Sequence, residues 1–365
     1  MPANALTLAK MPTFFRVSLL ASFLAVGVVV GIHARDSAEA ETRSTIPAFA
    51  LSAEGFTTAA DVRPHNRISL DIADINEALS SFPPDYATAL SRYAFGRHFN
   101  WRDSSHSLAF FADDYQGRME RTLPGVAAMG VDPSFQHQLI ASALMGTGAF
   151  SGSGPRRSLP DAARISAIES GILATMLNWC RLEWTEASIR GPQDGNWSLA
   201  NGSPKNWSEL FAFWYGFEGQ HSLHQEMTRI SERFDLPEHP TRMLTTPLAS
   251  GQVTLLTESW PEDDAEQVWA ALDVAALLLL LDRVADLDDA MMAGGETAIA
   301  AQWHIRGAWL AAADSFGRAD REQAQAIQDL LLNAEEFPDA DTLRAAIRGV
   351  IDQLVMDPKQ MGTAL

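Results

Sequence analysis

Apolar residues recur every three to four positions along most of this 365-residue chain, and this spacing constrains the fold more than any other feature. It places the apolar side chains on one face of a helix. No window alternates apolar and polar residues between turn signals for long enough to predict a strand. With 47% hydrophobic residues, the chain can also bury a full core. We therefore predict an all-α fold with antiparallel helices in one or two bundles.

Runs rich in proline, glycine and serine separate the periodic segments and predict the domain organisation. The helices expected between them cover residues 68–79, 86–99, 135–144, 162–188, 206–234, 262–292, 296–314, 319–333 and 339–355. We expect a flexible leader at residues 41–66, a helical domain at 67–235, a proline-rich connector at 236–261, and a C-terminal helical bundle at 262–357 that packs on the first domain. Asn100-Trp101 precedes His106 much as Asn206-Trp207 precedes His221, which suggests two related helical halves, although chance explains the match as well.

The N-terminus has the pattern of an export signal. Lys10 and Arg16 precede an apolar run at residues 17–32, and Ala38-Glu39-Ala40 follows as a small-residue cleavage pattern. The run is slightly short for a bilayer-spanning helix, which favours a cleaved signal peptide at residues 1–40. The alternative is an uncleaved anchor that holds the chain to the inner membrane by residues 17–32. Either way we expect a periplasmic or secreted protein.

Charge and cysteine content narrow the partners. Forty-six acidic and 27 basic residues give a formal net charge of -19, which repels nucleic acid and attracts cations. The single cysteine, Cys180, excludes a disulfide within the chain and all multi-cysteine metal sites. A bound metal must therefore use oxygen and nitrogen ligands, which suit hard or borderline cations such as iron.

Helical bundles hold metals with carboxylates and histidines that face inward, and Glu-x-x-His is the common local unit. Glu218-Gly219-Gln220-His221 has this spacing inside the expected aromatic helix at 206–234. Glu183 and Glu186 form an acidic pair among tryptophans on the preceding helix and are its expected partners. The alternative is that these glutamates form the solvated stripe of an amphipathic helix.

Catalytic patterns are weak in this sequence. It contains no glycine-rich phosphate loop, nucleophile elbow or His-Glu-x-x-His helix, which disfavours nucleotide-using and hydrolytic enzymes. A di-iron oxidase would need a second Glu-x-x-His, and only the shorter-armed Asp103-Ser104-Ser105-His106 stands in for it.

The order of several segments resembles the Fe-assimilating periplasmic protein family, first known from algae and with bacterial relatives. The resemblance covers residues 65–235 and is carried by Asp74-Ile75-Asn76-Glu77-Ala78-Leu79, Leu182-Glu183-x-x-Glu186-Ala187, Lys205-Asn206-Trp207-Ser208-Glu209 and Phe211-Ala212-Phe213-Trp214-Tyr215-Gly216. It implies a secreted helical protein that aids iron uptake by binding the metal without catalysing a reaction, with Glu183 and Glu209 at the positions of the family's acidic motif.

A weaker similarity connects the chain to imelysin-type iron-regulated proteins, whose signature is Gly-x-His-x-x-Glu. Gly219-Gln220-His221 matches the first positions, but His224 replaces the glutamate. The residues and the resemblance together predict a periplasmic iron-binding protein, with Glu183, Glu186, Glu209, Glu218 and His221 as metal ligands and an inner-membrane iron transporter as a further partner. The alternative is a metal-free helical scaffold or binding module of the cell envelope; Glu218 and His221 would then face water.

Overall fold

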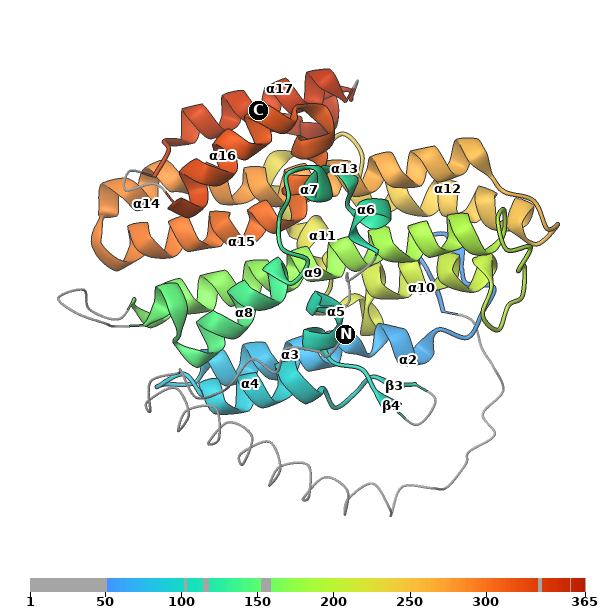
Figure 1. Cartoon of the computed structure of the whole chain (residues 1–365), viewed down its shortest axis with the longest axis horizontal. Coiled ribbons are helices and arrows are strands. Elements are labelled where there is room, and N and C mark those ends of the chain that lie inside the picture. The colour runs from blue at the N-terminus through green and yellow to red at the C-terminus, as the bar shows by residue number, and fades with distance from the viewer. Residues whose placement is uncertain are drawn as a thin grey trace, which may run out of the picture. The chain divides into compact units, whose positions relative to one another are not determined.

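The computed structural model describes residues 51–101, 104–113, 118–151, 159–333, 337–354 and 356–364. Within these ranges the fold is all-α apart from two hairpins of two-residue strands, as the sequence predicts (Figure 1). None of the helices in these ranges is long and apolar enough to cross a bilayer. The predicted signal peptide at residues 1–40, with its alternative anchor at 17–32, lies outside the described residues.

The order of elements is as follows. The strands are β1 Ser52–Ala53, β2 Phe56–Thr57, β3 Asn100–Trp101 and β4 Ser104–Ser105, paired β1 with β2 and β3 with β4 in antiparallel register. The helices of the first part are α2 Arg63–Asn66, α3 Ile68–Ser80, α4 Tyr86–Phe95, α5 Leu108–Asp113, α6 Met119–Thr122, α7 Pro124–Ala128, α8 Phe135–Met145, η2 Gly148–Phe150, α9 Asp161–Arg190, α10 Ser203–Tyr215 and η3 Phe217–Gly219. They are followed by α11 Leu223–Phe234, α12 Pro240–Leu255, α13 Glu262–Ala285, α14 Leu287–Ala293, α15 Gly295–Ala319, α16 Arg321–Asn333, α17 Ala340–Gln353 and η4 Pro358–Ala364.

The 30-residue helix α9 organises the core. Most of its residues from Ala167 to Thr185 are buried on every side, as expected for a helix enclosed by others. It packs most extensively on α15 and also contacts α10, α8 and α13. The crossing with α15 is close because Gly307 has no side chain: a Cβ there would lie 2.6 Å from the Cβ of Ser170 and 3.0 Å from the nitrogen of Gly171. The small residues at this crossing thus let α9 and α15 approach each other backbone to backbone.

Two parts of the predicted organisation are wrong. The described portion of the expected flexible leader, from residue 51, is folded: Phe56 and Val62 are buried, and α2 packs on α10. Most of the expected proline-rich connector is helix α12, in which Pro240 starts the helix at a position that needs no N–H donor. The helices on both sides of α12 belong to one compact unit, residues 49–365.

The expected helix at 206–234 is interrupted, and the suggested duplication is not visible. The chain leaves α10 at Gly216, whose φ of 70° is a left-handed conformation that glycine tolerates, and re-enters a helix only at Leu223. Asn100-Trp101 lies in the β3–β4 hairpin, whereas Asn206-Trp207 lies in α10. The two matching segments therefore have different structures.

Candidate functional site

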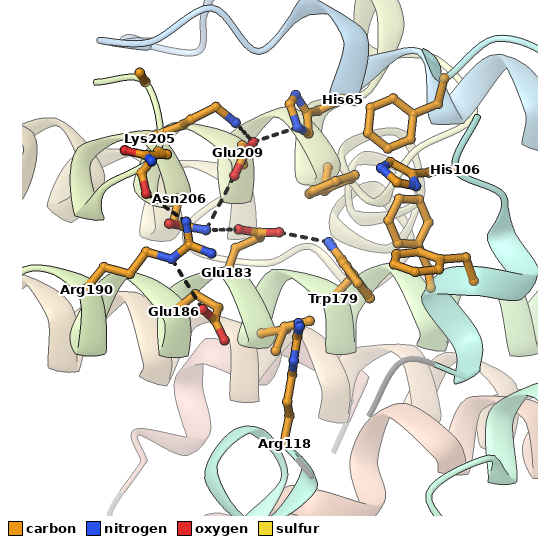
Figure 2. A pocket seen from close by; sticks show the side chains of 17 residues that line it. His65, His106, Arg118, Trp179, Glu183, Glu186, Arg190, Lys205, Asn206 and Glu209 are labelled. Carbon is orange, nitrogen blue, oxygen red and sulfur yellow. Dashed lines mark hydrogen bonds and ion pairs between the residues drawn. The ribbon is translucent and has the colours of Figure 1, made fainter. Parts of the chain in front are cut away.

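Two helices, α9 and α10, bring three of the four predicted acidic ligands to one cavity of about 270 Å³. Glu183 and Glu186 are three residues apart on α9 and so share a helix face. Glu209 comes from α10, which packs along α9. His65 comes from α2 and lies on the same cavity (Figure 2). The structure thus gathers three of the five predicted ligands.

Glu183 and Glu209 are connected by one amide group. Asn206 Nδ2 donates to Glu183 Oε2 at 2.6 Å and to Glu209 Oε2 at 3.4 Å. The other oxygen of Glu183 accepts from Trp179 Nε1 at 2.9 Å, one helical turn earlier on α9. Both carboxylates are buried, with 7% and 6% of the residue exposed. The amide of Asn206 therefore connects two buried carboxylates, as the dashed lines in Figure 2 show.

Glu209 has two basic partners. His65 Nε2 lies 2.6 Å from Glu209 Oε1, and Lys205 Nζ contacts the same oxygen from one turn earlier on α10. Burial favours the protonated form of Glu209, but the charges and hydrogen bonds of His65 and Lys205 outweigh it and lower its pKa below the usual range. Glu209 is therefore an ionised carboxylate in this site.

Glu183 behaves in the opposite way. Burial raises its pKa well above the usual range, and the nearby charge of Glu209 raises it further, against the hydrogen bond from Asn206. The surroundings thus shift the pKa values of Glu183 and Glu209 in opposite directions. Two carboxyl groups whose pKa values are pushed apart by their surroundings are a frequent sign of a functional site.

The rest of the cavity wall is aromatic and basic. Phe111 packs on Trp179 at 4.3 Å and on Phe213 at 5.4 Å between ring centroids, which lowers the local polarity. Glu186 pairs with Arg190 at 3.3 Å, one turn later on α9. Arg118 and His106 also line the cavity (Figure 2).

One buried oxygen at the site is left without a donor. Asn206 is 4% exposed, and its Oδ1 has no hydrogen-bond partner among the residues that the structure describes. An unsatisfied buried carbonyl is costly and rare. Together with the carboxylates of Glu183 and Glu209, it supplies the oxygen donors that a hard cation prefers.

Glu218 and His221 do not join this site. Glu218 lies in η3 and His221 just after it, both exposed, with φ values of 53° and 47°. The Glu-x-x-His spacing places two ligands together only on a continuous helix, and here the helix has ended. His221 instead borders a separate cavity of about 400 Å³ with Glu169 and Glu226. The prediction of an inward-facing Glu-x-x-His is therefore wrong.

A second group of possible ligands lies on α3 and after α4. Asp71, Asp74 and His98 each offer one ligand atom, and these atoms lie within 4.8 Å of one another. Asp71 is buried and accepts from the His98 backbone nitrogen at 3.1 Å; burial raises the pKa of Asp71. Asp74 is already paired with Arg92 at 3.0 Å. Because a guanidinium keeps its charge, it competes permanently with a metal for Asp74.

Sequence reasoning missed His65, Asn206 and Lys205 as members of the site. His65 was assigned to the flexible leader, yet Pro64 in Arg63-Pro64-His65-Asn66 is a helix-start signal that marks α2. Lys205 and Asn206 were noted only within the family motif, where their spacing to Glu209, four and three residues, puts all three on one face of α10.

Comparison with known proteins identifies the family. The model of the low iron-inducible periplasmic protein family matches residues 18–229, which include α2, α9, α10 and the whole set of acidic residues at the cavity. Neither the curated proteins nor the solved structures contain a significant match. Since the matched segment covers more than half of the chain, this protein belongs to the low iron-inducible periplasmic protein family.

Proposed function

We propose that this protein binds iron in the periplasm as a non-catalytic accessory to iron uptake. Glu183, Glu186 and Glu209 supply carboxylate ligands, and His65 and Asn206 complete the set. The observation that carries the proposal is the pair of buried carboxylates, Glu183 and Glu209, bridged by Asn206 at the wall of a cavity. The family's iron-related, periplasmic character supports it.

The ionisable partners of Glu209 make this cavity the better of the two candidate sites. A metal ion must displace the groups that pair with its ligands. At Glu209 these are the imidazole of His65 and the amine of Lys205, and an imidazole nitrogen is itself a common metal ligand. At Asp74 they are the guanidiniums of Arg92 and Arg97, which keep their charge and do not bind a metal. Iron therefore fits Glu183 and Glu209 better than Asp71 and Asp74.

Elemental analysis of the exported protein, purified without chelator, tests the proposal. We expect about one iron per chain in the wild type and less than about a tenth of that in Glu183→Gln/Glu209→Gln, because the amides keep the shape and remove the anionic ligands. The exposed pair Glu218→Ala/His221→Ala is the matched control and keeps its iron. Each variant is checked for an unchanged circular dichroism spectrum.

Two other results would contradict the proposed iron site. Iron that persists in Glu183→Gln/Glu209→Gln and disappears in Asp71→Asn/Asp74→Asn would move the site to α3. A wild type that holds no iron, and whose melting temperature does not rise when iron is added, would leave a metal-free helical scaffold as the function.

The raised pKa of Glu183 predicts that iron binding depends on pH. Below that pKa Glu183 carries a proton, which the metal must displace, so affinity should rise with pH and each bound ion should release about one proton from Glu183. Anaerobic titration calorimetry with ferrous iron, in two buffers of different protonation enthalpy, measures this release. Glu183→Gln should lower the number of protons released. An affinity that stays constant between about pH 5 and 8 would contradict the assignment of Glu183 as a ligand.

The remaining part of the proposal concerns export of the chain and delivery of the bound iron. We infer that residues 1–40 direct export and that the bound iron is passed to an inner-membrane iron transporter. Co-purification of the chain with a membrane-embedded iron permease, lost when iron is withheld, is the expected result.

A further inference from the structure

A third cavity lies between α8, α15 and α16, and its chemistry differs from that of the proposed iron site. It has a volume of about 300 Å³ and an apolar, aromatic lining. Its main wall residues are Phe135, Leu139, Phe150, Trp303, Trp309 and Leu310. A cavity of about 150 Å³ already holds benzene, so this one has room for a molecule of two rings or a short alkyl chain. It contains none of the acidic residues proposed to bind iron.

An arginine without a carboxylate partner faces this apolar space. Arg306 lines the cavity, lies 4.6 Å from the ring centre of Trp303 and 4.9 Å from that of Phe337, and donates through Nε to the carbonyl oxygen of Leu331. In the described part of the chain it forms no ion pair with an aspartate or glutamate. Burial lowers the pKa of Arg306 to about 10, which reflects the cost of a charge kept from water. The forked guanidinium retains donors suited to a carboxylate.

A second donor in the same wall lacks an acceptor. Trp309 is 1% exposed, and its indole Nε1 has no hydrogen-bond partner among the described residues. A buried indole N–H normally donates to an acceptor, so a buried indole without one is unusual. Trp309 precedes Phe316 on α15 and packs against it at 4.9 Å, which holds the ring in place. The cavity therefore combines an apolar lining with two kinds of hydrogen-bond donor, the guanidinium of Arg306 and the indole N–H of Trp309.

We propose that this cavity is a binding site for a small carboxylic acid with an apolar body. The ring or chain lies against Phe135, Phe150 and Trp303, and the carboxylate accepts hydrogen bonds from the guanidinium of Arg306. The Trp309 indole supplies a further donor to the ligand. The acid restores to Arg306 a counter-charge that none of the described side chains around it provides. The site is independent of the iron site, since it uses other helices and no acidic residue.

Titration calorimetry of the full chain with 2-naphthoate and octanoate tests the proposal, one acid probing an aromatic body and the other an aliphatic one. We expect one molar equivalent of at least one acid to bind, and 2-naphthamide, the neutral analogue, to bind about tenfold or more weakly than 2-naphthoate if the aromatic acid is the ligand. Arg306→Met keeps an unbranched apolar stem and removes the guanidinium. It should weaken acid binding by about tenfold or more. Arg344→Met, at a half-buried arginine of α17 that pairs with Asp288 and Asp341 and does not line this cavity, is the matched control and should bind as the wild type does.

The proposal is overturned if neither acid binds, or if wild type and Arg306→Met bind the acid equally well. If Arg306→Met does not fold, Trp309→Phe serves as the second variant, because it removes the N–H donor and keeps the ring. For an aliphatic ligand, octanamide replaces 2-naphthamide as the neutral analogue. A neutral amide that binds the wild type as tightly as its acid also rejects the site, and this comparison needs no variant.

Discussion

Replacing Asp273 by alanine is expected to lower the free energy of unfolding by about 3–5 kcal/mol, because it leaves a buried charge without its partner. Arg181 on α9 is fully buried and donates to Asp273 Oδ1 on α13 at 2.9 Å. The same oxygen accepts from Ser315 Oγ at 2.8 Å and from Arg318, both on α15. One carboxylate thus connects three central helices, and its loss strands the Arg181 guanidinium in the core.

Urea unfolding followed by circular dichroism measures this effect. Asp288→Ala is the matched control, since Asp288 is exposed and lies 3.5 Å from Arg344 at the surface; its removal should cost less than about 1 kcal/mol. Arg181→Met/Asp273→Leu should recover much of the loss, because a buried ion pair replaced by apolar groups is often neutral. Asp273→Ala with the stability of Asp288→Ala would show that Arg181 finds another partner.

Replacing Gly317 by alanine is the second substitution with a large expected effect. Gly317 lies in α15 where this helix crosses α7, and a Cβ there would be 2.4 Å from the carbonyl oxygen of Gly125 and 2.6 Å from its carbonyl carbon. Both contacts are with backbone, so no side chain can rotate away. A forced separation of packed helices costs about 1–3 kcal/mol, and it would also stretch the 2.8 Å hydrogen bond from the Gly125 nitrogen to Asp314.

Gly349→Ala provides the control for Gly317→Ala. Gly349 lies inside α17, and the nearest atoms to its added Cβ are the side-chain atoms of Gln323 at 3.7 Å. Alanine should therefore stabilise the protein by about 0.5–1 kcal/mol through its higher helix propensity. Thermal unfolding of the two variants should give shifts of opposite sign. Equal shifts would mean that α7 moves away from α15 at little cost.

The helices themselves could be predicted from the sequence because their signals are local. Three-to-four spacing and turn residues predict α3, α8, α9, α15, α16 and α17 to within about five residues, whereas the single helix expected at 262–292 is divided into α13 and α14. The failures have local causes as well. Gly216 was not recognised as a helix end, so Glu218 and His221 were placed on a helix that had already stopped. The prolines at residues 236–261 predict a connector, although Pro240 occupies the first helical position of α12.

The candidate site was only partly accessible from the sequence. Glu183 and Glu186 share a face of one helix, which spacing alone predicts, and Glu209 entered through the family resemblance. His65 and Glu209 lie about 140 positions apart in the sequence. Their contact could not be predicted, because it depends on α2 packing against α10. The opposite pKa shifts of Glu183 and Glu209 depend equally on burial and on neighbours from other helices.

The sequence by itself determined the all-α class, most helix positions and the acidic, single-cysteine composition that restricts any metal to oxygen and nitrogen ligands. Only the tertiary structure decided which carboxylates meet, in which direction the pKa of each is shifted, and that Arg306 faces an apolar cavity. The reason is physical. Periodicity and capping act within one or two helical turns, whereas a site depends on side chains that helix packing brings together from distant parts of the chain.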